Sequence, residues 1–321
     1  MIKVERLVKT FCTTKAVDGI SFEVAEGETL ALLGTSGCGK TTTLKMLNRL
    51  IEPDSGTISI NNKNILEAPP ETLRRGIGYV LQNNGLFPHY TVAENIAIVP
   101  QLLKWDKVKT DKRVSELLDK LHLGKEHLKA YPNELSGGQQ QRIGLARALV
   151  ADPPVLLMDE PFGALDNVTR SKIHSEFKAL DELKRKTIIL VTHDVQEAFE
   201  LADRIALMDK GKIVQIGRPA ELLFKPANEF VSGFLNEQRL QLEFKAIKIT
   251  DLWEHLPEGG RKTNTSSLSA DADFWSALEQ FKFIKGENLN ILNQQSKEIK
   301  NISFEALMAA YSQYKHLQPH D

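Results

Sequence analysis

The sequence predicts an α/β fold with a parallel core sheet and an antiparallel edge, followed by a smaller α+β piece. Residues 28–33 are a short apolar run that a glycine-rich turn links to a helical pattern ending at Pro53. Residues 155–158 form a continuous apolar run of the kind found in buried parallel strands. Residues 2–24 alternate apolar and polar side chains, which is typical of an antiparallel sheet edge.

The glycine-rich turn, Gly34 to Thr41, fits the phosphate-binding pattern GxxxxGK(S/T) and has a strand before it and a helix after it. Its glycines let backbone N–H groups converge on one point, and the helix N-terminus adds positive potential there. Lys40 can reach terminal phosphates, and the Thr41 hydroxyl can ligate Mg²⁺. The alternative is a glycine turn with an incidental lysine, which the flanking strand and helix disfavour.

The following segments predict further elements of the same sheet. Residues 53–56 form a turn, 57–62 begin a hairpin, and 77–81 are another buried strand that leads to Gln82. The loop at 83–90 is unusually apolar, so it either packs on its own domain or receives a partner. Thr91 and Glu94 then have the spacing of a capping box, and residues 111–123 show the period of an amphipathic helix.

Two glycines stand in the first turn of the next predicted helix. Ser136 is a natural N-cap, with Gln139 at the position of its capping-box partner. Gly137 and Gly138 each cost roughly 1 kcal/mol of helix stability relative to alanine. We therefore expect another group to approach this backbone closely.

Polar side chains follow the predicted core strands. Asp159 and Glu160 come directly after the 155–158 run, at the end of a parallel strand where open α/β sheets bind ligands. Asp159 can hold Mg²⁺, and Glu160 can orient or deprotonate a water. His193 follows the strand at 187–192, and on these grounds alone a structural hydrogen-bonding role is the more common one. Phe11, in a turn-like stretch, is by the same reasoning either a half-buried anchor or a ligand contact. A hairpin at 204–216 closes the sheet, and Pro219 opens a short helix.

Composition narrows the class of protein. The formal net charge of −1 argues against nucleic-acid binding through a broad basic surface. Two cysteines, Cys12 and Cys38, exclude a disulfide framework and fit a reducing compartment. Met1 begins an alternating strand pattern that is unlike a signal peptide, and no apolar run approaches the ~20 residues of a membrane span. If the protein works at a membrane, we expect another chain to cross it.

Jointly, these motifs resemble the ATP-binding-cassette (ABC) ATPases over about residues 1–235, with a helical subdomain at about 91–150. The resemblance implies a P-loop NTPase fold of the ABC type, ATP and Mg²⁺ as cofactors, and two ATP sites buried in a head-to-tail homodimer. It implies ATP contacts from Phe11, Gly34, Ser36, Gly37, Cys38, Gly39, Lys40, Thr41 and Thr42. The Mg²⁺ shell would be Thr41, Gln82 and Asp159, and the catalytic residues Glu160, His193 and Gln82. Asp166 would link the two sites, and the signature segment Ser136, Gly137, Gly138 and Gln139 would meet the opposite subunit's ATP.

Residues 81–97 most closely resemble the quaternary-amine importer ATPases (glycine betaine, choline, carnitine or proline type), and residues 103–105 and 158–166 fit the same group. This resemblance implies a separate transmembrane permease that docks on the apolar loop, and indirectly an extracytoplasmic solute-binding protein. It places the chain at the cytoplasmic face of the inner (plasma) membrane as a peripheral subunit. An importer for another small solute, such as an amino acid or phosphonate, is the nearest alternative. A non-transport ABC ATPase or a nucleotide-sensing module is a more distant one.

The last part of the chain has a different texture. Residues 236–268 are predicted to be a linker, whose stretch at 257–267 is rich in glycine, serine and threonine. Residues 269–321 have the order helix, strand, turn, strand, helix, which weakly resembles one cystathionine-β-synthase-type (CBS) repeat. There is room for only one such repeat, so a docking or dimer-bracing module is an equal alternative to a ligand-binding one. His316 and His320 are predicted to lie in a solvated tail.

Overall fold

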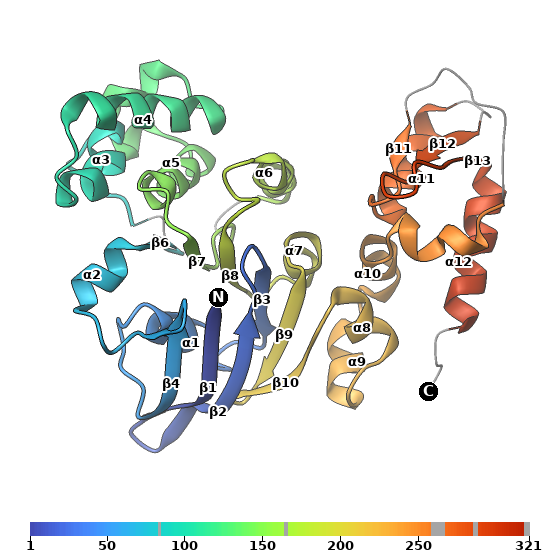
Figure 1. Cartoon of the computed structure of the whole chain (residues 1–321), viewed down its shortest axis with the longest axis horizontal. Helices are drawn as coiled ribbons and strands as arrows, with labels where there is room; N and C mark the ends of the chain where they lie inside the picture. The colour runs from blue at the N-terminus through green and yellow to red at the C-terminus, as the bar shows by residue number, and fades with distance from the viewer. Residues whose placement is uncertain (83–84, 164–165, 258–266, 285–287, 318–321) are drawn as a thin grey trace. The chain divides into compact units, whose positions relative to one another are not determined.

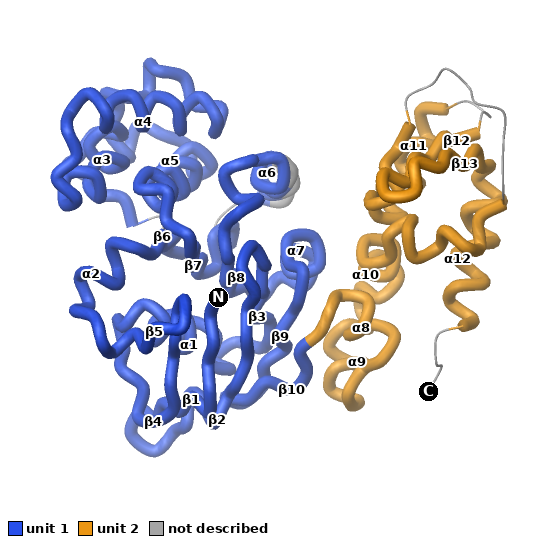
Figure 2. The backbone as a smooth tube through the Cα atoms, viewed as in Figure 1, with its two compact units in different colours: residues 1–216 blue, residues 217–321 orange. Residues whose placement is uncertain are grey.

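The computed structural model describes residues 1–82, 85–163, 166–257, 267–284 and 288–317 (Figure 1). Outside these ranges lie Asn83 and Asn84 of the predicted apolar loop, residues 164–165 before Asp166, most of the predicted flexible link, and His320. The chain divides into two compact units, Met1–Ile216 and Gly217–Asp321 (Figure 2). None of the described helices combines the length and apolar character that crossing a bilayer requires.

Unit 1 is built around a six-stranded sheet whose four central strand pairs are all parallel. Its spatial order is β10 (Lys212–Gly217), β9 (Arg204–Asp209), β3 (Thr29–Gly34), β8 (Thr187–Thr192), β7 (Val155–Asp159) and β6 (Ile77–Val80). Every residue of β7 and β8 is buried, because a parallel strand in the middle of an α/β unit is covered on both faces. The continuous apolar runs in the sequence reflect this burial.

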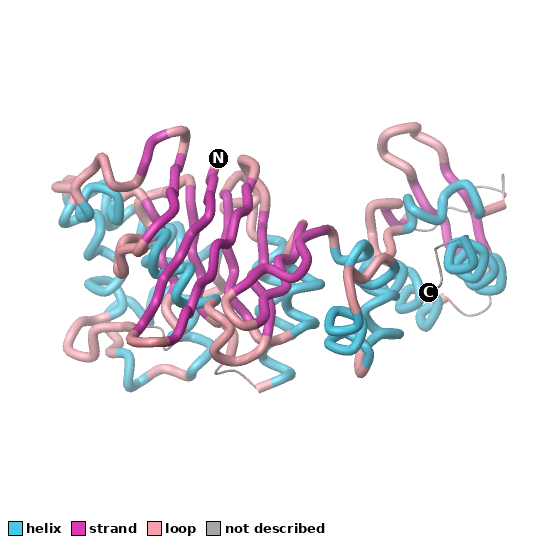
Figure 3. The backbone as a smooth tube through the Cα atoms, turned by 90° about the horizontal axis from the view of Figure 1, so that it is seen from below, coloured by secondary structure: helices cyan, strands magenta, loops and turns pink. Residues whose placement is uncertain are grey.

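The antiparallel edge forms a second sheet in unit 1, as the alternating pattern predicts. Its order is β2 (Thr14–Val24), β1 (Ile2–Phe11), β4 (Ser55–Ile60) and β5 (Lys63–Asn64). Figure 3 shows these strands running beside one another, with helices on the far side of the strand layer. Side chains from both sheets share one apolar cluster, in which Leu7, Leu30 and Met46 are fully buried. The P-loop strand β3 is thereby fixed between the two sheets.

The helices of unit 1 fall into two groups. One group lies along the strands: α1 (Lys40–Leu47), α2 (Pro70–Arg75), α6 (Asn167–Ala179) and α7 (Val195–Leu201). The other packs together between β6 and β7 in the sequence: α3 (Val92–Leu102), α4 (Lys107–Lys120), the short 3₁₀ turns η1 (Lys125–Lys129) and η2 (Pro132–Glu134), and α5 (Gly137–Leu149). Figure 1 shows α3, α4 and α5 side by side, and they occupy the range predicted for the helical subdomain.

Local capping explains where these helices begin. The capping boxes at Thr91 with Glu94 and at Ser136 with Gln139 are both present. The α4 helix starts earlier than its amphipathic period suggests, because the Asp106 side chain accepts the backbone N–H of Lys109. The first turn of α4 is solvent-exposed and so adds nothing to the apolar period.

Unit 2 begins with helices and ends in the small α+β fold that the sequence predicts. Its elements are α8 (Pro219–Phe224), α9 (Glu229–Asn236), α10 (Arg239–Ala246), η3 (Ile249–His255), β11 (Leu268–Ser269), α11 (Phe274–Phe283), β12 (Leu289–Leu292), β13 (Ile299–Ile302) and α12 (Phe304–Leu317). The first part of the predicted linker is therefore helical, because Leu242, Ile249 and Leu252 are fully buried in unit 2. The two units meet at 216/217, whereas the resemblance placed the end of the ATPase domain near 235; that domain division stays a prediction.

A buried ionic cluster lies at the centre of unit 2. The Glu243 carboxylate is 1% exposed and pairs with Arg239 Nε at 3.0 Å and Lys315 Nζ at 2.8 Å. It also accepts the Tyr311 hydroxyl at 2.6 Å. These partners hold the pKa of Glu243 below its ordinary value against the opposing effect of burial. The cluster ties α10 to α12.

Candidate functional site

The P-loop wraps around the Lys40 ammonium. Lys40 Nζ donates to the carbonyl oxygens of Gly34 at 2.9 Å and Thr35 at 2.8 Å, and the residue is 5% exposed. A Cβ on Gly34 would lie 2.1 Å from Met208 O, and one on Gly39 2.2 Å from the carbonyl oxygen of Ala16. The turn therefore requires glycine at both positions, as a loop curled around an anion does.

The remaining predicted P-loop residues lie in the same turn and in the first turn of α1. Ser36 and Gly37 are exposed, Thr42 is half-buried, and Cys38 is buried with its sulfur 3.7 Å from Lys40 Nζ. The backbone N–H groups of this segment and the N-terminus of α1 form a site suited to a phosphate group.

Thr41 and Asp159 meet beside the P-loop. Thr41 Oγ1 donates to Asp159 Oδ1 at 2.8 Å, which joins the start of α1 to the end of β7. Burial raises the pKa of Asp159, and the hydrogen bond from Thr41 opposes that shift. A hydroxyl and a carboxylate are the hard oxygen donors that Mg²⁺ prefers, so the donor set fits this ion.

Glu160 connects two loops that follow neighbouring strands. Gln82 Nε2, after β6, donates to Glu160 Oε2 at 2.8 Å, and His193 Nδ1, after β8, lies 3.2 Å from the same oxygen. Glu160 itself has a φ of +44°, a conformation that non-glycine residues seldom adopt. Because β6, β7 and β8 are parallel neighbours, their carboxyl ends bring these three side chains to one point.

The signature segment opens α5 and keeps its interactions within the helical group. Ser136 Oγ accepts the backbone N–H of Gln139 at 3.3 Å, and Gln139 Oε1 accepts the N–H of Ser136 at 2.9 Å. Gln139 Nε2 also lies 3.0 Å from His127 Nε2. Gly137 and Gly138 are exposed, so the N–H groups at this helix end are open to a ligand from outside unit 1.

The two remaining predicted site residues stand at turns. Phe11 is 46% exposed at the end of β1, with Lys9 Nζ 5.6 Å from its ring centroid, so it is not a core anchor. Asp166 is exposed, and its carbonyl accepts the N–H of Arg170 at the start of α6. The contacts described above do not join either residue to Lys40 or Glu160.

A fully buried amide, which the motifs did not indicate, shapes the apolar loop after Gln82. Asn95 Oδ1 accepts the Phe87 N–H at 2.8 Å. Its Nδ2 lies 3.1 Å from Phe87 O, 3.0 Å from Tyr90 O and 3.1 Å from Thr91 O. A polar residue on the apolar face of α3 was the available signal. Phe87 and Tyr90 remain 43% and 38% exposed, so this loop presents aromatic surface outward.

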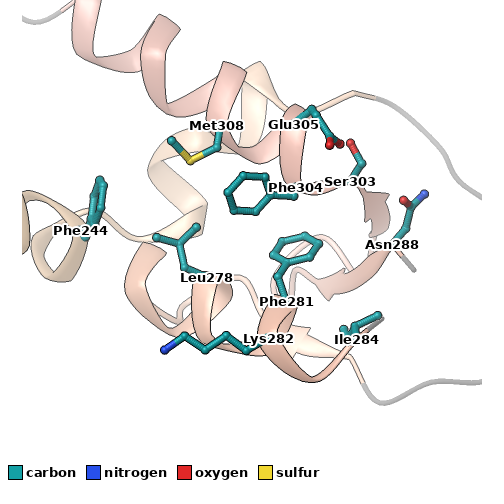
Figure 4. A pocket seen from close by; sticks show the side chains of 10 residues that line it. All are labelled: Phe244, Leu278, Phe281, Lys282, Ile284, Asn288, Ser303, Phe304, Glu305 and Met308. Atoms are coloured by element: carbon teal, nitrogen blue, oxygen red, sulfur yellow. The ribbon is translucent and has the colours of Figure 1, made fainter. Parts of the chain in front are cut away.

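Unit 2 contains an apolar pocket of about 600 Å³ (Figure 4). The rings of Phe281 and Phe304 meet edge to face in its wall, with centroids 5.7 Å apart. Asn288, Ser303 and Glu305 supply polar groups on one side. A pocket of this kind is compatible with both predictions for this piece, a ligand-binding repeat and a docking module.

The fold and the site define a P-loop nucleotide-binding protein. A sequence model of the ABC transporter family matches residues 17–163. The glycine betaine/carnitine/choline transport ATP-binding protein OpuCA of Bacillus subtilis (strain 168) is 55% identical over 298 residues, 92% of this chain and 76% of that protein. The glycine betaine uptake system ATP-binding protein YehX of Escherichia coli (strain K12) is 43% identical over 308 residues, 96% of this chain and 99% of that protein. The chain therefore belongs to the ABC transporter family as one of its ATP-binding proteins.

The solved structures agree with this membership. The ATP-binding cassette MJ0796, described as a dimer in a post-hydrolysis state bound to ADP and phosphate, has a TM-score of 0.62 and 33% identity. The match covers 68% of this chain and 98% of that one. The predicted ABC fold and the resemblance to the quaternary-amine group are both confirmed.

Proposed function

We propose that this chain is the ATP-hydrolysing subunit of an ABC importer for a quaternary-amine osmoprotectant. The observation that supports hydrolysis is the placement of Glu160. Its carboxylate is held by Gln82 and His193, beside the pair of Thr41 and Asp159. The printed names of OpuCA and YehX support the cargo class, which we infer to be glycine betaine, choline, carnitine or a related compound.

The residues divide the chemistry among themselves. Lys40 and the P-loop N–H groups bind the phosphates, and Phe11 stacks on the adenine. Glu160 acts as general base toward the attacking water, and His193 contacts the γ-phosphate. Thr41, Gln82 and Asp159 would hold Mg²⁺, which supplies charge neutralisation at the phosphates when bound. Catalysis in such a site is mostly positioning and charge stabilisation.

The signature segment supports a head-to-tail homodimer. Ser136, Gly137, Gly138 and Gln139 leave an exposed helix N-terminus without a phosphate-binding turn of its own. We infer that each copy offers this helix end to the ATP held by its partner, with Asp166 linking the two sites. Two such ATP molecules then lie between the two copies.

The exposed aromatic loop supports docking of a transmembrane permease. Phe87 and Tyr90 face outward while Asn95 fixes the loop backbone. The chain would then work at the cytoplasmic face of the inner membrane as a peripheral subunit, with an extracytoplasmic solute-binding protein as an indirect partner and no nucleic acid involved.

The test of hydrolysis is the Glu160→Gln variant. We expect ATPase activity to fall by at least ~10²-fold, the usual contribution of a general base, while ATP binding is retained. Lys40→Ala is the matched comparison, because it removes the phosphate contact and should abolish binding. Unchanged turnover in Glu160→Gln would refute the assignment of this base.

The test of the cargo is uptake of labelled glycine betaine, choline, carnitine and an unrelated amino acid, in cells with and without the chain. Measurements at low and high osmolarity separate osmotic control from basal transport. Loss of only the quaternary amines is the expected result. Uptake of all the amines in its absence would contradict the cargo assignment and leave the ATPase assignment standing.

A further inference from the structure

The loop that carries His193 is held by polar contacts on both sides. Thr192 Oγ1, at the end of β8, donates to Glu197 Oε2 at 2.5 Å and accepts the Asp194 N–H at 2.9 Å. Asp194 Oδ1 in turn accepts the N–H groups of Gln196 at 2.8 Å and Glu197 at 3.2 Å, which caps α7. His193 thus lies between two anchored residues, and its ring reaches out to Glu160.

Glu197 is an unusual anchor because it is a carboxyl group in the protein interior. The residue is 2% exposed, and its Oε1 has no hydrogen-bond partner among the described residues. An ionised carboxylate in that position would leave a buried charge with a single hydrogen bond. The neutral acid is the form that the surroundings favour.

The charged groups around Glu197 act in the same direction on balance. Burial raises the pKa of Glu197 to about 8; the nearby Asp194 and Glu160 carboxylates also raise it, whereas the hydrogen bond from Thr192 and the Arg170 guanidinium lower it. Glu197 is therefore mostly protonated at neutral pH and loses its proton over the mildly alkaline range.

Arg170 gives the loop a second attachment. Its Nη1 lies 2.9 Å from Asp194 Oδ2, so α6 contacts the loop from the side opposite Thr192. The helix α6 begins next to Asp166. The anchoring of His193 thus involves β8, α7 and α6 together.

We propose that Glu197 is a positioning residue, whose neutral side chain fixes Thr192 and thereby the backbone that carries His193 toward Glu160. Ionisation of Glu197 releases this anchor. The inference rests on the proposed role of His193 in ATP hydrolysis. It adds a group that touches neither nucleotide nor water and acts through the loop.

The first test compares four variants of the full chain by ATPase rate, ATP affinity and thermal unfolding. Glu197→Ala and Thr192→Val should each lower the ATPase rate roughly three- to tenfold, the rate equivalent of one lost hydrogen bond, with ATP affinity retained. The double variant should be no worse than either single one, because both remove the same contact. Glu200→Gln is the matched control, since it is a carboxyl on the same helix that faces His174.

The second test is the pH profile, which remains available if Glu197→Ala fails to fold. Glu197→Gln keeps an oxygen acceptor for Thr192 and has no proton to lose. We expect its rate at pH 7 to stay near that of the parent chain, and the parent's decline above about pH 8 to be absent in the variant. An identical alkaline decline in both proteins would overturn the proposal.

His193→Ala distinguishes the two levels of the argument. A full ATPase rate in His193→Ala would remove the proposed function of that residue and the present inference with it. Loss of activity in His193→Ala, with unaltered activity in both Glu197→Ala and Thr192→Val, would overturn only the positioning role.

Discussion

Replacing Asn95 with alanine should destabilise unit 1 and loosen the aromatic loop. The buried amide makes one accepted bond, from the Phe87 N–H, and its two N–H groups serve three carbonyl oxygens. Three bonds at full strength, at about 1 kcal/mol net each, give a loss of about 3 kcal/mol in the free energy of unfolding. Asn95 is 0% exposed, so water cannot easily replace these contacts.

The assay is urea unfolding of the parent chain and of Asn95→Ala, together with hydrogen exchange of the Phe87 amide. That amide should be protected in the parent chain and exchange faster in the variant. Gln101→Ala is the control: it lies exposed on the same helix and should change stability by less than about 0.5 kcal/mol. A cost below about 1 kcal/mol for Asn95→Ala, or an equal cost for Gln101→Ala, would refute the reasoning.

Two further predictions concern charge and thiol chemistry. The hydrogen bond from Arg113, assisted by Lys120, lowers the pKa of Glu182 to about 2, so its stabilisation is complete above pH ~4.5 and declines as pH falls toward 2. Allowing for partial exposure, Glu182→Gln should lower the free energy of unfolding by about 2 kcal/mol at pH 7 and by clearly less at pH 3; an equal loss at both pH values in urea titrations would contradict the pairing. Exposed Cys12 should alkylate before buried Cys38, and only modification of Cys38 should block ATP binding, with ATP protecting. Mass spectrometry of the labelled sites decides this, and Cys38 labelling with full nucleotide affinity would show that the P-loop tolerates the modification.

Most of the fold was predictable because its determinants are local. The capping boxes at Thr91 and Ser136 close within three residues, and the apolar run of β7 reports its burial on both faces. The start of α4 was predicted wrongly, since the Asp106 cap precedes an exposed turn that carries no apolar period. Helix α10 was taken for linker because its eight residues show too short an apolar stripe to stand out.

The site was predictable in part, for a different reason. The sequence shows that Glu160 and His193 each follow a buried strand, but only strand order makes them neighbours, and strand order depends on contacts distant in sequence. Glu197 escaped notice because its spacing from Asp194 is that of an ordinary capping box. Its actual partner, the Thr192 hydroxyl, depends on the path of the backbone from β8 into α7.

The ionic cluster around Glu243 constrains the order of events during synthesis. Lys315 Nζ, one of its partners, lies 72 residues further along the chain. At ~5–20 residues per second, the ribosome needs roughly 4–14 s to make that interval. Until Lys315 and Tyr311 emerge, burying Glu243 would strand a negative charge, so α10 must wait in a solvated state. The strands of unit 1 end by Gly217 and face no such delay. Nascent chains should therefore acquire the nucleotide-binding unit first, and the second unit only once α12 has been translated.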